Sequence, residues 1–463
     1  MIEITNFILT VFLILITGYF FKNKFSNTFE FILIVSLLIP VPLFLYVRYV
    51  YLSDILFVFY LVYNLSGIIS NWKRGFSIKL NLFLLLLFIP LLTTLIAHWN
   101  GNINNYGYVI FHLSRASIVL GVLHKGLSIG QRNQSLIPNI LAMFSFLWFL
   151  ICLIGLAQFM NIIDTDVYYP NEELFTGFLG MDKPQIALIS VLVVNILLYL
   201  NVGHLKWLKN VTLMLSFLLV SLLGSRQGFV FIGMSFLFYL LFSKSNKLMS
   251  SNFIRILPLI ALILCFGIFV FSFIENDERF KILSDSFESK NPILALLGAR
   301  DPVFFESFQD MANTELYYFG NGLGTEEIGY IEKDEGVFVR EEGSLRTYFE
   351  GEIFRVLWAS GILGVFLYSI LFFRFIKLGV KIRFGKFKKK FGVYGSLLLS
   401  LAIINILYSF GQFNLFTTSG QNIPFLYLIW FVLSLLYSKL SLIVRGVAIK
   451  NKVNAGHTYH SSL

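Results

Sequence analysis

Long apolar runs separated by short polar connections make up most of this chain, from Ile4 to Ile443. A helix needs about 20 mostly apolar residues to cross the hydrocarbon core of a bilayer. Windows of this kind recur about 13 times, which predicts an all-α polytopic membrane protein with about 13 transmembrane helices. The predicted windows are 4–21, 29–47, 54–70, 79–97, 107–124, 136–160, 184–201, 208–224, 227–243, 253–274, 353–376, 392–410 and 423–444.

One long interruption divides this membrane domain into three parts. Residues 1–274 carry the N-terminal transmembrane helices, residues 275–352 form one large loop, and residues 353–463 carry the C-terminal transmembrane helices and a tail. In the loop, the stretch 301–311 reads "DPVFFESFQDM". Its Asp-Pro start and the spacing of its apolar residues predict a short amphipathic helix lying over the membrane surface or the mouth of the bundle.

The distribution of charge predicts how the chain is oriented in the membrane. The chain is 57% hydrophobic and 13% charged, with a net charge of +10. Lys and Arg fall on alternate connections, which the positive-inside rule assigns to the cytoplasm, so the N-terminus is expected outside and the C-terminus inside. The 275–352 loop, expected outside, holds 18 Asp and Glu against 7 Lys and Arg. Topology and anionic lipid account for the positive charge, so we do not expect nucleic-acid binding.

Arg226 stands out because it interrupts two apolar runs in "SLLGSRQGFVF". The topology places it in a tight turn at the outer end of two spans, together with Ser225, Gln227 and Gly228. Glycine lets the backbone approach a ligand closely, and a guanidinium can bind phosphate oxygens bidentately. We therefore consider a rim site for a lipid-linked phosphate, beside the alternative of a rim arginine that snorkels to lipid phosphates.

Four further charged positions call for a reason. Arg115 lies well inside the fifth window, where both a buried structural pairing and a functional role are open. Glu350 and Glu352 come just before the eleventh window, and Arg355 follows three residues after Glu352 on the same helical face. These carboxylates either stabilise the helix start through a salt bridge or act as a general base on a hydroxyl.

Metal and cofactor motifs are weak in this sequence. The stretch Asp164–Asp166 matches a DxD metal motif, but the topology places it outside, away from nucleotide sugars. The glycines of "GNGLG" lack the Lys-Ser/Thr that follows in a phosphate-binding loop. We expect neither a metal nor a cofactor.

Several stretches occur in an order that resembles a known family. The stretch "LLGSRQGFV" is similar to the Ser-Arg-x-Gly element of the O-antigen polymerase and O-antigen ligase superfamily of bacterial envelope proteins. The stretch "GARDPVFFESFQDMANTELYYFGNGLG" resembles its loop pattern of an arginine, an amphipathic stretch and Gly-x-Gly-x-Gly. The stretch "EGEIFRVLWASGILGVFLY" resembles its closing pattern, and "FTGFLGMDKPQIAL" its Gly- and Pro-containing start of a span. The resemblance covers about residues 175–370.

The resemblance implies a GT-C-type, metal-independent inverting glycosyltransferase of lipopolysaccharide biosynthesis in the bacterial inner membrane. Its donor would be an undecaprenyl-diphosphate-linked oligosaccharide on the periplasmic face, so the N-terminus would be periplasmic and the C-terminus cytoplasmic. Carried over, Arg226 and Arg300 would hold the donor diphosphate and stabilise the departing group. We add Arg115 as a third candidate for the diphosphate, and Gly322 and Gly324 as supporting loop residues.

The chain departs from the family at the expected base. Where the ligases carry His-Asn ahead of the Gly-x-x-Gly helix, this chain has Glu350-Gly351. The base would then be Glu350, or Glu352 close by, which is nearer to the repeat-unit polymerases. We therefore expect a repeat-unit polymerase that transfers a glycan to a hydroxyl of another lipid-linked unit, with a chain-length regulator protein as a partner. A ligase that transfers polymer to lipid A core and a polysaccharide or lipid transporter remain alternatives.

Overall fold

A computed structural model gives the architecture. It describes residues 2–25, 27–39, 42–44, 47–73, 77–103, 106–132, 134–160, 162–163, 177–178, 181–200, 206–222, 226–242, 318–323, 330–334, 337–340, 352–409 and 423–460. For Arg226, Gln227 and Glu352 the structure describes the backbone alone. The predicted window 253–274 and the predicted amphipathic helix at 301–311 lie outside the described residues.

Helices dominate the described part. They are α1 (Ile2–Phe21), α2 (Thr28–Val35), α3 (Leu52–Lys73), α4 (Ser77–Trp99), α5 (Tyr106–Arg132), α6 (Leu136–Phe159), α7 (Lys183–Tyr199), α8 (Lys206–Leu222), α9 (Arg226–Phe242), α14 (Glu352–Phe384), α15 (Lys388–Tyr408) and α16 (Ile423–His460), with a short 3-10 helix η1 (Lys22–Lys24). Three antiparallel hairpins join them: β1 (Pro42–Phe44) with β2 (Val47–Tyr51), β3 (Gly177–Phe178) with β4 (Met181–Asp182), and β5 (Tyr330–Asp334) with β6 (Val337–Arg340).

By length and composition, four of the described helices are apolar enough to cross a membrane. These candidate spans are Leu136–Phe159, Arg355–Phe384, Lys388–Tyr408 and Tyr427–Arg445. Shorter apolar helices cover Leu52–Ser66, Phe88–Trp99, Ile186–Tyr199, Trp207–Leu222 and Gly228–Phe242. The chain is thus a helical membrane protein by these criteria.

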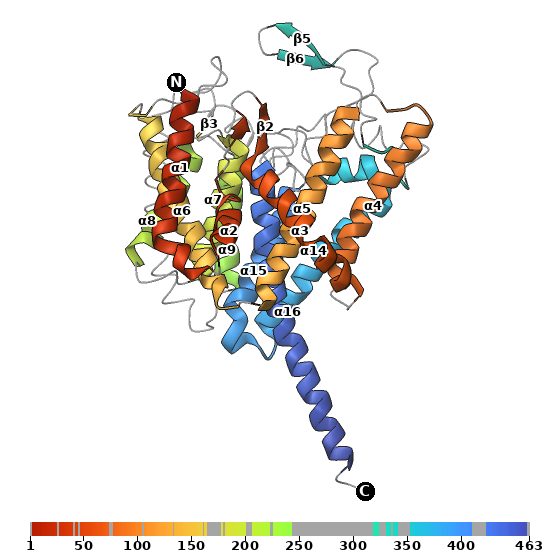
Figure 1. Ribbon diagram of the computed structural model, residues 1–463. Helices are drawn as coiled ribbons and strands as arrows, with labels where there is room; N and C mark the ends of the chain where they lie inside the picture. Colours follow the sequence, from red (N-terminus) through yellow and green to blue (C-terminus); the bar gives the residue numbers. More distant parts are fainter. Residues whose placement is uncertain are drawn as a thin grey trace.

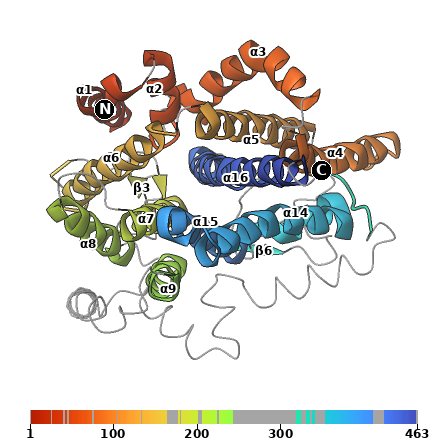
Figure 2. The same cartoon turned by 90° about the horizontal axis from the view of Figure 1, so that it is seen from below.

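The helices form a bundle with α16 in its middle. Seen along the bundle, α16 lies between α5 on one side and α14 and α15 on the other (Figure 2). Helix α14 also packs against α15 and α4, and α7 packs against α9. The two ends of the chain lie at opposite ends of the bundle, and α16 extends past it (Figure 1). We call the end where α1 begins the N-side and the end from which α16 extends the C-side.

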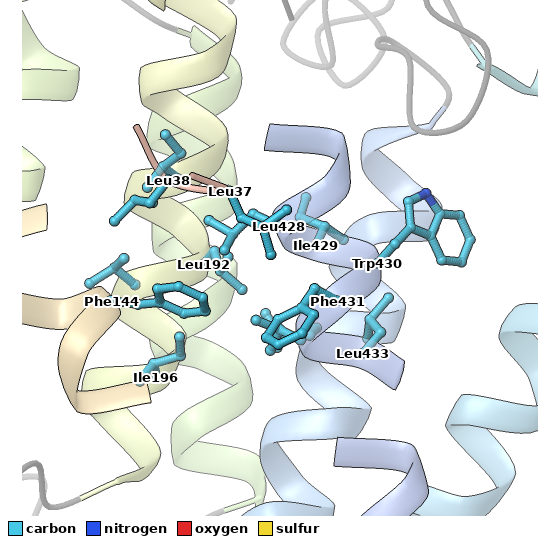
Figure 3. Packing of buried hydrophobic residues seen from close by; sticks show 14 of the residues in the cluster. Leu37, Leu38, Phe144, Leu192, Ile196, Leu428, Ile429, Trp430, Phe431 and Leu433 are labelled. Atoms are coloured by element: carbon cyan, nitrogen blue, oxygen red, sulfur yellow. The ribbon is translucent and has the colours of Figure 1, made fainter. Parts of the chain in front are cut away.

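Interdigitated apolar side chains fill the space around α16. Phe144 of α6 and Leu192 and Ile196 of α7 face Phe431 and its neighbours on α16 (Figure 3). On the other side of α16, glycines allow close contact with α5, because a Cβ at Gly126 would lie 2.0 Å from Ser434 Oγ. Small residues at such contacts are typical of helices that pack in membranes.

The second predicted window, 29–47, is wrong as a single helix. Asn27 caps the start of α2, because its side chain accepts a hydrogen bond from the N–H of Glu30 (2.7 Å), but the helix ends at Val35. Turns follow to Ile39, and the next described residues, 42–44 and 47–51, are the paired strands β1 and β2. The reason lies in "IPVP" at 39–42, because proline removes a helix donor and keeps the residue before it out of the helical region.

Candidate functional site

The expected site residues fall at the starts of two helices, in one loop and within α5. Arg226 is the first residue of α9, followed by Gln227 and by Gly228, which is buried. Glu352 is the first residue of α14, Gly322 lies in the loop 318–323, and Arg115 lies in α5. The remaining candidates lie outside the described residues: Ser225, Arg300, Gly324 and Glu350.

Helices α9 and α14 run in the same direction, which a contact at their last residues demonstrates. The carbonyl of Phe242, at the end of α9, accepts hydrogen bonds from Arg383 Nε (2.5 Å) and Ser396 Oγ (2.8 Å). Arg383 belongs to the last turn of α14 and Ser396 to α15. The ends of α9 and α14 therefore meet on the C-side.

The starts of the same two helices both lie near the end of α15. The rings of Phe231, in α9, and Tyr408, in α15, are 5.4 Å apart between centroids. The next residue, Ser409, accepts a hydrogen bond through its carbonyl from the N–H of Ile353 (3.2 Å). The structure thus brings the first turns of α9 and α14 to one region on the N-side, although 125 residues separate Arg226 from Glu352.

A buried polar contact joins α9 to α7 and α15. Asn195 Nδ2 of α7 donates to Ser235 Oγ of α9 (2.7 Å), and Ser400 Oγ of α15 donates to Asn195 Oδ1 (2.6 Å). All three residues are completely buried. Because a buried polar group that loses its partner is costly, this contact fixes the register of α7, α9 and α15.

Helix α14 is broken at Gly361, which has φ 63° and ψ −167°. Its first part, 352–360, runs at an angle to the rest and lies close to α4 (Figure 1). The break deprives the last carbonyls of the first part of their helical donors, because the N–H of Leu363 bonds instead to the carbonyl of Tyr318 (3.3 Å).

The glycine loop, which we define as residues 318–323, supplies donors at this break. The N–H of Asn321 donates to the carbonyl of Trp358 (2.7 Å), and Thr93 Oγ1 of α4 donates to the carbonyl of Ala359 (2.7 Å). Thr94 Oγ1 in turn accepts from the N–H of Leu323 (2.8 Å). The loop, α4 and the broken helix therefore form one hydrogen-bonded unit, which we call the glycine clamp.

Positive φ angles and close approach require glycine at the centre of the clamp. Gly320 and Gly322 both have φ 85°, a left-handed conformation that other residues rarely adopt. A Cβ at Gly320 would lie 2.4 Å from the backbone nitrogen of Ser360, and one at Gly361 would lie 2.3 Å from the carbonyl of Tyr318. The two glycine motifs noticed in the sequence are thus in direct backbone contact.

The first part of α14 also carries Arg355, whose exposed fraction is 0%. A salt bridge between Arg355 and Glu352 was one of two alternatives for this carboxylate in the sequence, and of Glu352 the structure describes only the backbone. A fully buried guanidinium needs strong compensation, since isolated charges are very costly away from water. Its burial shows that this segment faces the interior of the bundle at the N-side.

Arg115 lies in a buried ion pair. Its guanidinium contacts the carboxylate of Asp54 at the start of α3, and the two side chains are 6% and 7% exposed. Tyr427 of α16 donates to Asp54 Oδ1 (3.0 Å) and accepts from Arg115 Nη1 (3.4 Å). The other carboxylate oxygen accepts from the N–H of Tyr51 (2.8 Å). This cluster joins α3, α5 and α16, and it supports the pairing that the sequence left open.

Sequence reasoning missed the residues that complete these units: Asp54, Thr93, Thr94 and Tyr427. Asp54 offered a signal, because an acidic residue at the edge of an apolar window is unusual. The two threonines offered none, since Thr in an apolar helix commonly bonds to its own backbone. Among the described residues, no three His, Cys, Asp or Glu side chains are grouped closely enough to hold a metal ion.

Comparisons with known proteins add no assignment. No known protein family matches the chain, and no curated protein matches it.

Proposed function

We propose that the chain is an oligosaccharide repeat-unit polymerase with its reaction site on the N-side of the bundle. A growing glycan on one undecaprenyl diphosphate is transferred to a hydroxyl of a repeat unit on another lipid carrier. The N-side then faces the periplasm and the C-side the cytoplasm of a bacterial inner membrane. The alternation of helix directions supports this, because η1, the α14–α15 turn and the end of α16 carry their lysines on one side.

The observation that carries the proposal is the glycine clamp. Two stretches that resemble the polymerase and ligase superfamily, "FGNGLG" and "ASGILG", meet backbone to backbone at Gly320 and Gly361. A third such stretch contains Arg226, and it starts a helix close to the end of α15, as α14 does. An active site requires residues that are distant in sequence to lie close together in space. These stretches of one motif series do so.

The start of α9 suits a diphosphate. The N–H groups of a first helical turn and the helix dipole favour an anion there. The first turn of α9 contains no acidic residue that would occupy this position. In our proposal Arg226 binds the phosphate oxygens from this turn, and Arg300 closes on them from the loop.

The reaction forms one glycosidic bond and breaks one. The acceptor hydroxyl attacks the anomeric carbon of the donor, its proton passes to Glu350 or Glu352, and the bond from that carbon to the diphosphate oxygen breaks with inversion. Undecaprenyl diphosphate leaves with the additional negative charge, which the arginines stabilise. Because α14 begins at Glu352, the clamp would set the position of this carboxylate relative to the loop.

Arg115 takes an indirect part in this scheme. Its ion pair with Asp54 holds the starts of α3 and α16 against α5. Binding the diphosphate directly would require it to exchange this carboxylate for a phosphate. We therefore assign it a supporting role and leave direct binding to Arg226 and Arg300.

The test compares surface glycans from a host strain that lacks the gene with strains that carry variants. In Arg226→Gln and Glu350→Gln strains, we expect polymer to fall to core plus one repeat, with normal amounts of protein in the membrane. Lys377→Gln is the matched control, since it removes one charge from an exposed residue of α14. Wild-type polymer in the Arg226→Gln strain contradicts the proposal. Bare core, with polymer accumulating on undecaprenyl diphosphate, identifies a ligase instead.

The buried Arg115–Asp54 pair favours one other candidate, a polysaccharide or lipid transporter. Ionisable residues inside a membrane bundle often mark a transport pathway. A transporter predicts that Arg115→Gln stops export of a finished glycan while Arg226→Gln leaves it unchanged. The polymerase predicts the opposite ranking, because Arg226 would contact substrate and Arg115 would not.

A further inference from the structure

A group of exposed cations lies at the C-side ends of α5, α14 and α16 and at the start of α15. We call it the basic collar and define it by its exposed Lys and Arg residues: Arg132, Lys381, Lys386, Lys389, Lys390 and Arg445. It coincides with the ends of the four candidate spans, which begin or end at Leu136, Phe384, Lys388 and Arg445. The collar thus lies where the apolar surface of the described helices stops.

Internal contacts hold the collar in place. Arg383 and Ser396 tie the α14–α15 turn to the carbonyl of Phe242 at the end of α9. On the other side, Ser438 Oγ of α16 donates to the carbonyl of Leu127 in α5 (2.8 Å). The cations therefore project from helices that internal contacts hold together, close to the ends of the candidate spans.

The chain offers the collar few carboxylates. No Asp or Glu follows Glu352 in the sequence. Among the acidic side chains that the structure describes, Glu30 pairs with Lys125 (2.6 Å) and Asp54 with Arg115. Moreover, α15 begins with three lysines and no side-chain cap, so their charges oppose the positive end of the helix dipole. An external anion at this turn would relieve that repulsion.

One exposed aromatic ring among the cations points to the kind of anion. Phe384, at the turn, is 58% exposed, and Arg383 Cζ lies 5.3 Å from its ring centroid. Lys386 Nζ lies 5.5 Å from the ring of Phe387, and Lys390 Nζ 5.4 Å from the ring of Phe391. An exposed ring beside lysines suits the boundary between headgroups and acyl chains, where the ring enters the apolar layer and the cations reach phosphates. A soluble anion would have no use for the exposed ring.

We infer that the basic collar binds the headgroups of anionic phospholipids, with the α14–α15 turn as its principal contact. Phosphatidylglycerol is the simplest probe of this class. Bound headgroups neutralise the lysines at the start of α15, and so stabilise the hairpin that ends, on the N-side, beside the proposed reaction site. The inference does not depend on the polymerase proposal, because it concerns the opposite end of the molecule and a different ligand.

The experiment uses the full-length protein in nanodiscs of phosphatidylcholine with increasing phosphatidylglycerol. It measures the lipid retained by native mass spectrometry and the midpoint of thermal unfolding. We expect Lys389→Gln/Lys390→Gln to weaken the preference for phosphatidylglycerol by about fivefold for each lysine removed. Lys22→Gln/Lys24→Gln is the matched control, because it removes two exposed lysines from η1 on the same side. The control should retain most of the preference.

Three results would overturn the inference. The first is an equal preference for phosphatidylglycerol in the wild type and in Lys389→Gln/Lys390→Gln. The second is an equal loss in the control, which would indicate net charge alone. The third is the same stabilisation by soluble glycerol phosphate at matched concentration. If the glutamine variant does not fold, Lys389→Arg/Lys390→Arg decides the matter, since it keeps both charges and must keep the preference at low salt.

Discussion

Helix α5 carries an ion pair towards each end, and the two pairs differ in their surroundings. On the N-side, Arg115 and Asp54 are 6% and 7% exposed and share Tyr427 with a third helix. Towards the C-side, Lys125 and Glu30 are 14% and 12% exposed, and the lysine lies 5.5 Å from the ring of Tyr60. The N-side pair is thus more completely shielded from water than the C-side pair, and the C-side carries in addition the exposed cations of the basic collar.

The largest expected effect on stability comes from neutralising the carboxylate of an ion pair. Asp54→Asn should lower the free energy of unfolding by about 3–5 kcal/mol, because a buried guanidinium loses its counter-charge. Glu30→Gln should cost about 1–2 kcal/mol, since water reaches this pair more easily. Thermal unfolding of the purified variants in one detergent gives both values.

The double variant Asp54→Asn/Arg115→Gln is the control for this pair of measurements. It removes both charges and should recover part of the stability lost in Asp54→Asn. Equal losses in Asp54→Asn and Glu30→Gln would mean that burial does not distinguish the two pairs.

The second prediction concerns the glycine clamp. Gly361→Ala should destabilise the protein by about 3 kcal/mol, because alanine is strained at φ 63° and its Cβ would meet the carbonyl of Tyr318 at 2.3 Å. Gly233→Ala, inside α9, is the matched control. A Cβ there meets nothing within 4 Å, so it should be neutral or stabilise by up to about 1 kcal/mol. Similar melting points for both variants would show that the break in α14 adapts without cost.

The smallest effect is expected from single hydroxyl groups on α4. Thr93→Val keeps the shape of the side chain but removes the donor to the carbonyl of Ala359, which should cost about 1–2 kcal/mol. Thr212→Val is the control, because Thr212 Oγ1 bonds only within α8, to the carbonyl of Leu208 (2.7 Å). We expect it to cost less than about 1 kcal/mol. A larger loss of unfolding free energy in Thr212→Val than in Thr93→Val would contradict the importance of the glycine clamp.

Much of the helical framework could be predicted from apolar runs alone. The window 136–160 corresponds to α6 (Leu136–Phe159) and the window 227–243 to α9 (Arg226–Phe242). Such runs work because a spanning helix must satisfy its own backbone, so length and hydropathy suffice to find it. The hairpin β1–β2 was missed because the run of apolar residues was given more weight than the helix-breaking Pro40 and Pro42.

The candidate site was less predictable. Arg115 could be singled out by its depth, but its partner Asp54 lies on another helix and only packing brings them together. The glycines at 320, 322 and 361 could be recognised as motifs, whereas the break in α14 depends on the carbonyl of Tyr318 reaching Leu363. Sequence indicates which residues are unusual, and contacts between distant segments decide what each of them touches.

The break at Gly361 also determines how far the long part of α14 extends across a membrane. From Gly361 to Phe384, a helix rising 1.5 Å per residue is about 36 Å long. That is slightly more than the roughly 30 Å hydrocarbon layer of a bilayer. With Phe384 at one headgroup layer, the first part of α14 begins to run sideways at the other. In the proposed reaction, a carboxylate at its start would therefore work at the depth where a lipid-bound diphosphate emerges from the acyl chains.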